Sequence, residues 1–321
     1  MRRRIVVPDD YPVFLRGTPA EARLRALGDV TIHDTDPADQ AELVRRCADA
    51  EIVYNTYGRT KFTAELLAAL PKLKLISRPG TGVDGIDLEA CRRQGIAVTH
   101  LRGNDADEIA EHAIALMLCC LRRIPEMDRA LRAGQWSADY IRGARGATLG
   151  IVGLGAIGRR TAILGKALGM KVLAWSFGAD GGRAAEAGAE RAELDDLLRR
   201  SDVVSLHLRV SPDTRGMFDA RRLGLMKPGA VLVNTARAAL VDRDALLEAL
   251  GAGRIVAGLD VFHAEPLAKD DPLLALANVV MTPHDGSLMP DVTERAVMTA
   301  VINIENWLNG APTNLAVDPR A

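Results

Sequence analysis

Apolar and polar positions follow two alternating patterns along the chain. Short runs of β-branched and aliphatic residues are followed by longer stretches whose apolar positions recur at helical spacing. This alternation is typical of parallel sheets covered by helices, so the sequence predicts an α/β fold. A first series of strands is expected at residues 4–7, 30–33, 52–54, 73–77 and 96–99. A second series of six, which we expect to form a complete sheet, is predicted at residues 148–152, 171–175, 203–206, 230–234, 256–259 and 279–281.

Three helical stretches lie outside this alternation. Residues 107–121 and 125–133 are predicted to form consecutive helices that connect the two series, with Pro125 in the first turn of the second helix. The last helical pattern, at 291–308, follows all the strands of the second series. We expect this helix to return to the first domain.

Length and charge narrow the class of protein. At 321 residues the chain is long enough for about two domains. It carries 41 basic and 42 acidic side chains and a net charge of −1, so no overall field attracts nucleic acid or an anionic membrane. A small-molecule partner is expected instead. No apolar run reaches the ~18 residues of a membrane span, and the start of the chain lacks the apolar stretch of a signal peptide.

The four cysteines indicate neither a metal site nor a disulfide framework. Cys119 and Cys120 are neighbours, whereas Cys47 and Cys91 stand alone in the sequence. We therefore expect reduced cysteines in a cytoplasmic protein that holds no metal ion.

A glycine-rich motif follows the first strand of the second series. Gly153, Gly155 and Gly158 are spaced as in the dinucleotide-binding fingerprint, and a helical pattern begins directly after them. The first glycine permits a tight turn, the second lets a pyrophosphate approach the backbone, and the third lets helix and strand pack closely. The start of the helix supplies N–H donors for an anion. The motif therefore predicts a dinucleotide-binding site.

The end of the next strand bears on the type of dinucleotide. In this fold a carboxylate about 20 residues after the glycine motif usually binds the ribose hydroxyls. Ser176 occupies this place, and the next candidates along the chain are Asp180 and Arg183. A hydroxyl can bind a ribose but does not repel a 2′-phosphate. The sequence therefore leaves the choice between NAD and NADP open.

The chain resembles the D-isomer-specific 2-hydroxyacid dehydrogenases over nearly its whole length. Besides the glycine motif, the resemblance rests on residues 78–87 (RPGTGVDGID), 110–116 (AEHAIAL), 226–238 (MKPGA to NTARA), 257–266 (AGLDVF to EP) and 282–284 (TPH). The resemblance depends more on the order and spacing of these stretches than on any one of them. It implies a flavodoxin-like substrate domain at 1–102 and 288–321 around an inserted Rossmann domain at 103–287. It also implies a homodimer, with the helical stretch after Asp107 as the contact.

Matched residue by residue, the family's three catalytic positions fall on Arg237, Glu265 and His284. The chemistry of each residue suits such a role. Imidazole ordinarily titrates near pH 6.5, and a neighbouring carboxylate favours the charged form that donates a proton. Arginine stays charged, and its planar fork matches the carboxylate and carbonyl oxygens of a 2-keto acid. The other histidines, His112 in the family's hinge helix included, are expected to be structural.

The resemblance also implies binding roles for further residues. The substrate carboxylate is expected at the loop that contains Gly80, Thr81 and Gly82, together with Arg237. Asp260 matches the acid near the nicotinamide carboxamide. The remaining cofactor contacts are expected from Ala156, Ile157, Thr235 and Ala236.

The sequence departs from the family pattern at Ala238 as well as at Ser176. A glycine commonly follows the catalytic arginine, so with Ala238 the backbone must avoid positive φ or carry strain.

The resemblance leaves the function open between two classes. The sequence favours reduction of a small 2-keto acid, with glyoxylate, hydroxypyruvate, pyruvate and 3-phosphohydroxypyruvate as undecided substrates. An NAD(H)-sensing interaction protein like the corepressors of this architecture is the alternative. Thr81 disfavours a phosphite dehydrogenase, which carries lysine there, and Glu265 disfavours a formate dehydrogenase, which pairs the histidine with glutamine.

Overall fold

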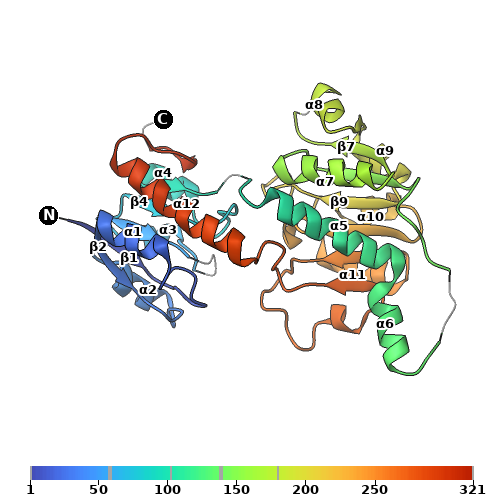
Figure 1. The fold of residues 1–321 in the computed structure, drawn as a ribbon, viewed down its shortest axis with the longest axis horizontal. Coiled ribbons are helices and arrows are strands. Elements are labelled where there is room, and N and C mark those ends of the chain that lie inside the picture. The colour runs from blue at the N-terminus through green and yellow to red at the C-terminus, as the bar shows by residue number, and fades with distance from the viewer. Residues whose placement is uncertain (1, 57–59, 102, 137–139, 179–180, 320–321) are drawn as a thin grey trace. The chain divides into compact units, whose positions relative to one another are not determined.

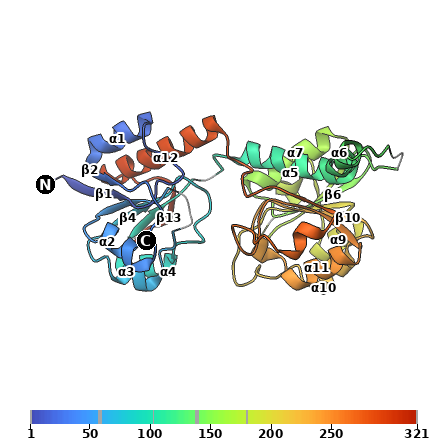
Figure 2. The same ribbon diagram turned by 90° about the horizontal axis from the view of Figure 1, so that it is seen from below.

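The chain divides into two compact units. The first unit contains Met1–Asn104 and Leu288–Ala321, and the second contains Asp105–Ser287. The computed structural model describes residues 2–56, 60–101, 103–136, 140–178 and 181–319. Each unit is a sheet between two layers of helices (Figures 1 and 2), which confirms the predicted α/β class.

The first unit has a sheet in the order β13-β5-β4-β3-β1-β2. Its strands are β1 (Arg3–Val7), β2 (Gly28–Ile32), β3 (Ile52–Tyr54), β4 (Leu75–Ser77), β5 (Ala97–Thr99) and β13 (Leu315–Val317). Its helices are α1 (Pro19–Leu27), α2 (Gln40–Cys47), α3 (Ala64–Ala68), α4 (Leu88–Gln94) and α12 (Pro290–Leu308). The five strands from β1 to β5 are parallel and have the flavodoxin-like order 2-1-3-4-5.

Strand β13 was not predicted and runs antiparallel to β5. The last helix does return to this unit, as the sequence predicts. The Tyr54 hydroxyl donates to the Val297 carbonyl at 3.2 Å, and Ser77 Oγ donates to the Ala300 carbonyl at 2.8 Å. Helices α1 and α12 cover one face of the sheet, and α2, α3 and α4 cover the other (Figure 2).

The second unit has a fully parallel sheet in the order β12-β11-β10-β9-β6-β7-β8. Its strands are β6 (Thr148–Val152), β7 (Lys171–Trp175), β8 (Glu190–Arg191), β9 (Val203–Leu206), β10 (Ala230–Asn234), β11 (Ile255–Leu259) and β12 (Val279–Met281). Numbered along the chain, the order is 3-2-1-4-5-6 with a seventh strand added, which is the Rossmann arrangement. The expectation of a complete six-stranded sheet is wrong, because β8 extends the edge beside β7. Both residues of β8 are charged and exposed, so no apolar run marks it.

Two layers of helices cover this second sheet (Figure 2). The helices are α5 (Ala106–Arg122), α6 (Ile124–Arg132), α7 (Ala156–Ala167), α8 (Gly181–Glu186), α9 (Leu194–Arg200), α10 (Ala220–Leu225) and α11 (Arg243–Gly251), with short 3₁₀ turns η1 (Ala238–Leu240) and η2 (Pro272–Ala275). Helices α5 and α7 pack on one face, and α9, α10 and α11 on the other. None of the described helices has the length and apolar character that a membrane span needs.

All four cysteines are free. Burial raises the pKa of the Cys47, Cys91 and Cys120 thiols to about 12, so these side chains are unreactive core residues.

Candidate active site

The glycine motif forms the loop between β6 and α7. Gly153 has a φ of +103°, and a Cβ there would lie 2.6 Å from the His207 carbonyl oxygen. A Cβ on Gly158 would lie 1.9 Å from the carbonyl oxygen of Gly153. Only glycine fits either position, because real Cβ atoms do not come so close to another atom.

The middle glycine faces open space. Within the described part of the chain, no atom lies within 4 Å of where a Cβ on Gly155 would be. Gly155 is also the N-cap of α7, and no described side chain caps this helix. The first N–H groups of α7, those of Ala156 and Ile157 included, are therefore left for a bound anion, as a dinucleotide pyrophosphate requires.

Ser176 follows directly after the last residue of β7, at the same edge of the sheet as the glycine loop. The Gly153 N–H donates to the carbonyl of Trp175 at 2.8 Å, so the ends of the two strands are joined. The Ser176 side chain is partly exposed. Arg183 lies in α8 and is exposed, whereas Asp180 lies outside the described residues.

Asn234 shapes the turn that leads to Arg237. This buried side chain accepts a hydrogen bond from the Ala236 N–H and donates one to the Arg237 carbonyl, both at 3.0 Å. Sequence reasoning missed Asn234, although an amide at the end of a buried strand is a typical turn former. Arg237 itself has extended backbone angles, and its Nη1 donates to the Ala236 carbonyl at 2.6 Å. Ala238 starts η1 and is not among the described residues with positive φ, so of the two expected alternatives the backbone avoids positive φ.

The hydroxyl of Thr235 is a buried polar group beside this turn. It is buried, and its Oγ1 has no hydrogen-bond partner among the described residues. An unsatisfied buried hydroxyl costs roughly 1–3 kcal/mol, which a ligand group would offset. Together with the open Gly155 loop, it fits a bound dinucleotide.

Glu265 and His284 form a hydrogen-bonded pair in the same unit. His284 Nδ1 lies 2.7 Å from Glu265 Oε2, and the other carboxylate oxygen accepts the Phe262 N–H at 2.9 Å. Partial burial acts to raise the pKa of Glu265, but the hydrogen bonds from His284 and Phe262 and the charges of His284 and Arg237 outweigh burial and lower it. Glu265 is therefore ionised at neutral pH and accepts a hydrogen bond from Nδ1–H, which leaves the Nε2 side of a half-exposed ring for other contacts.

Asp260 is the buried centre of a second hydrogen-bonded group. Its Oδ1 accepts the Thr282 hydroxyl at 2.6 Å and the Asp285 N–H at 3.1 Å, and its Oδ2 accepts the Gly286 N–H at 3.2 Å. His112 Nε2 lies 2.8 Å from Thr282 Oγ1 and 3.5 Å from Asp260 Oδ1. Burial acts to raise the pKa of Asp260, but His112 and Thr282 outweigh burial and lower it.

The same group has the composition of a metal site, but its buried carboxylate is already engaged in hydrogen bonds. Possible ligand atoms of His112, Asp260 and Asp285 all lie within 4.8 Å of one another. Both oxygens of Asp260, however, already accept hydrogen bonds from the chain. We therefore assign the cluster to hydrogen bonding. Sequence reasoning treated His112 as merely structural and gave Thr282 no role.

The residues expected to hold the substrate carboxylate belong to the first unit. Gly80, Thr81 and Gly82 lie in the loop after β4, at the carboxyl edge of that sheet. The loop is tied to the residues after β5, because the Leu101 N–H donates to the Gly80 carbonyl at 3.0 Å and His100 Nδ1 lies 2.9 Å from the Thr81 carbonyl. Their role in substrate binding stays a prediction.

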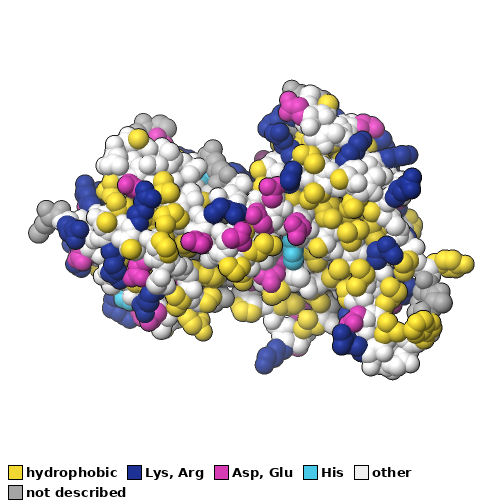
Figure 3. All heavy atoms as spheres, viewed as in Figure 1, with side chains coloured by type: hydrophobic (Ala, Val, Ile, Leu, Met, Phe, Trp, Pro, Cys, Tyr) yellow, Lys and Arg dark blue, Asp and Glu magenta, His cyan; other side chains and the backbone are white. Residues whose placement is uncertain are grey.

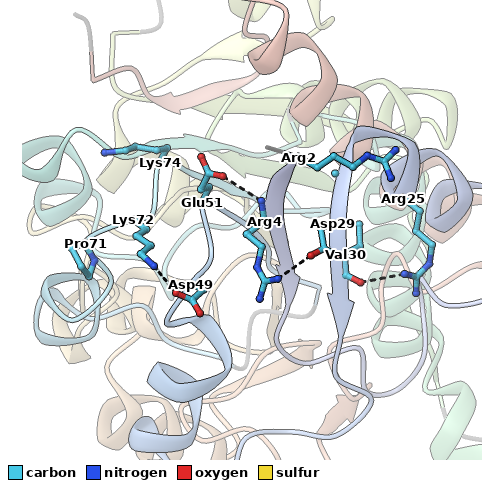
Figure 4. A pocket seen from close by; sticks show the side chains of 11 residues that line it. Arg2, Arg4, Arg25, Asp29, Val30, Asp49, Glu51, Pro71, Lys72 and Lys74 are labelled. Atoms are coloured by element: carbon cyan, nitrogen blue, oxygen red, sulfur yellow. Dashed lines mark hydrogen bonds and ion pairs between the residues drawn. The ribbon is translucent and has the colours of Figure 1, made fainter.

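A surface hollow of about 1090 Å³ lies at the opposite, amino edge of the first sheet (Figure 4). Its charged lining residues are Arg2, Arg4, Arg25, Asp29, Asp49, Glu51, Lys72 and Lys74. Each acid in it is already paired: Asp29 with Arg4, Asp49 with Lys72, and Glu51 with Arg3. The hollow contains none of the predicted site residues, and parallel α/β sheets bind ligands at the carboxyl edge.

The second unit is thus a Rossmann-type dinucleotide-binding domain, because a glycine-rich loop opens a helix at the point where its strand order reverses. A family model described as D-isomer specific 2-hydroxyacid dehydrogenase, NAD binding domain, matches residues 114–286, more than half of the chain. The chain belongs to the D-isomer specific 2-hydroxyacid dehydrogenase family, as the sequence motifs predict.

Curated relatives agree with this assignment. The chain is 39% identical over 292 residues to D-3-phosphoglycerate dehydrogenase of Mycobacterium leprae, covering 89% of this chain and 55% of that enzyme. The chain therefore spans about half the length of that relative. It is 38% identical over 299 residues to glyoxylate reductase of Aeropyrum pernix, covering 89% of both chains.

Solved structures agree as well. D-lactate dehydrogenase of Aquifex aeolicus, complexed with NAD and lactic acid, matches with a TM-score of 0.84 and 32% identity over 96% of both chains. An acyclic imino acid reductase in complex with NADPH and D-Arg matches with a TM-score of 0.88 and 29% identity, covering 98% of this chain and all of that one.

Proposed function

We propose that the protein is an NAD(P)H-dependent reductase of a small 2-keto acid, which acts in reverse as a D-2-hydroxyacid dehydrogenase. The observation that carries this proposal is the 2.7 Å contact between His284 and Glu265 in the unit that contains the glycine loop. An acid-paired histidine beside a dinucleotide site is the arrangement that proton delivery during hydride transfer needs.

In this reaction the chain delivers a proton and orients the substrate. His284 donates its Nε2 proton to the carbonyl oxygen of the keto acid, while Glu265 accepts a hydrogen bond from Nδ1 and stabilises the positive ring that precedes this transfer. Arg237 binds the carboxylate and polarises the carbonyl. The nicotinamide supplies the hydride when it is bound.

The dinucleotide is held by backbone groups and a few polar side chains. The N–H groups at the start of α7 bind the pyrophosphate, and the unpartnered Thr235 hydroxyl lies beside the turn that contains Ala236. Ser176 binds the ribose without excluding a 2′-phosphate, so the protein uses NADPH as well as NADH. Of the two solved structures named above, the lactate dehydrogenase is complexed with NAD and the imino acid reductase with NADPH.

A panel of keto acids tests the function. Glyoxylate, hydroxypyruvate, pyruvate and 3-phosphohydroxypyruvate are each supplied with NADH and with NADPH, and oxidation is followed by nicotinamide absorbance. We expect turnover of at least one, since the names of the relatives include enzymes for glyoxylate, lactate and phosphoglycerate. Tight cofactor binding without turnover of any of them would instead favour the NAD(H)-sensing interaction protein.

The proposal includes a homodimer, in which a second copy of the chain is the protein partner. Hydrophobic side chains gather over α5, α6 and α7 (Figure 3), and α6 buries none of its described residues. Ile124 and Leu131 on α6 and Ile163 on α7 are about half exposed. Apolar surface of this kind marks an interface. Sedimentation velocity is expected to show a dimer, and Leu131→Glu to shift it towards monomer; a monomeric wild type contradicts this part of the proposal.

A further inference from the structure

His112 joins three elements of the second unit at one point. It lies on α5, whereas Thr282 follows β12 and Asp260 follows β11. The side chains nevertheless meet, with His112 Nε2 2.8 Å from Thr282 Oγ1 and Thr282 Oγ1 2.6 Å from Asp260 Oδ1. Asp260 is 3% exposed, so its carboxylate depends on these partners rather than on water.

The donors in this chain of contacts can be assigned. Thr282 has one hydroxyl hydrogen, and it donates this hydrogen in the short hydrogen bond to the ionised carboxylate. The Thr282 oxygen must therefore accept a hydrogen bond from His112 Nε2–H. His112 carries a hydrogen on Nε2 in either charge state, and it orients the hydroxyl towards Asp260.

The Asp260 carboxylate also binds the backbone of the segment that contains His284. Its oxygens accept the N–H groups of Asp285 and Gly286, the two residues that follow His284. The segment closes tightly over the group, because a Cβ on Gly286 would lie 3.0 Å from Asp260 Oδ2 and 3.2 Å from the His112 ring. His284 itself has a φ of +57°, a conformation that requires support from its surroundings.

We propose that His112 is a positioning residue for His284: through the Thr282 hydroxyl it fixes the Asp260 carboxylate, which holds the backbone directly after His284. The positioning of the segment follows from the geometry alone, whereas its effect on catalysis rests on the proposed function. This task of Asp260 is additional to the nicotinamide contact that the family resemblance implies.

The charges around His112 support this role. The groups that face it are Asp260 and Asp285, and Asp260 raises the pKa of His112 more than partial burial lowers it. A positive His112 therefore strengthens the contact with the buried carboxylate, and a neutral one still donates from Nε2.

Hydrogen–deuterium exchange of the full chain without cofactor tests the positioning directly. His112→Leu and Thr282→Val each remove the link, and we expect the Asp285 and Gly286 amides to exchange at least about fivefold faster in both. Thr282→Ser keeps the hydroxyl, and Glu111→Gln changes the exposed neighbour of His112. Both are expected to exchange like the wild type, as are the amides of β6 in every variant.

Kinetics separate positioning from simple loss of structure. We expect His112→Leu to lower kcat by about tenfold, with less than about a twofold change in the KM of the keto acid, and His112→Gln to restore most of kcat because its amide still donates. Unchanged exchange in both His112→Leu and Thr282→Val overturns the proposal, as does failure of His112→Gln to restore kcat. Faster exchange in a protein that reduces no keto acid retains the positioning and rejects the proposed function instead.

Discussion

Replacing Glu265 by Gln removes the charge beside His284 while keeping an oxygen that can accept a hydrogen bond from Nδ1–H. Two unit charges about 4 Å apart interact by ~1 kcal/mol in water and ~4 kcal/mol at an effective dielectric constant of 20. Because the His284 and Glu265 side chains are 46% and 37% exposed, solvent screening keeps the value near the lower end, at about 1–2 kcal/mol. We therefore expect kcat for keto-acid reduction at neutral pH to fall by roughly 5- to 30-fold.

A comparison of two variants that each lose one negative charge isolates this effect. Proton delivery needs the positive form of the His284 ring, which the ionised Glu265 stabilises. Glu248→Gln, at an exposed position of α11, serves as the control for a lost negative charge elsewhere, and its kcat is expected to match that of the wild type. Unchanged kcat in Glu265→Gln, or an equally large drop in Glu248→Gln, would refute the electrostatic reasoning.

Three further predictions concern the same unit. Ser176→Asp is expected to shift the ratio of kcat/KM towards NADH by at least about tenfold, because a carboxylate repels a 2′-phosphate, and a fixed ratio would mean that Ser176 does not face the ribose. Gly158→Ala is expected to abolish NADH binding measured by fluorescence titration, because its Cβ would lie 1.9 Å from a backbone oxygen. The pKa of Glu265 lies below its ordinary 4.5, so its pairing with His284 is intact above pH 4.5 and lost as pH falls through the lowered value; kcat is expected to hold down to pH 4.5 and decline below it.

The predicted strands and the observed ones differ by at most two residues at either end, because buried parallel strands are continuous apolar runs. The two strands that were missed lack this signal. Strand β8 consists of Glu190 and Arg191, whose side chains are exposed. Strand β13 has three residues, and only Val317 is fully buried. Both lie at sheet edges, where pairing depends on the neighbouring strand more than on burial.

A similar difference separates the site residues that the sequence predicts from those that it does not. Motif spacing predicts the glycine loop, and the family resemblance predicts Glu265 and His284, because both signals consist of residues that are close together in the sequence. Asn234, Thr282 and His112 were missed because their roles depend on contacts between elements. His112 and Thr282 are 170 residues apart in the chain, and no periodicity relates a helix residue to a residue after a distant strand.

The backbone at His284 explains why such supporting residues matter. A residue in the left-handed region costs about 1–2 kcal/mol relative to an ordinary conformation. The two N–H groups that follow His284 donate to an ionised, buried carboxylate, and hydrogen bonds to charged groups contribute roughly 1.5–3 kcal/mol each. Asp260 therefore offsets the strain, and the left-handed turn lets one short segment bond Asp260 through its backbone and Glu265 through the His284 ring. The position of the ring thus depends on a carboxylate that it does not touch, and a substitution around Asp260 acts on proton delivery without altering Glu265 or His284.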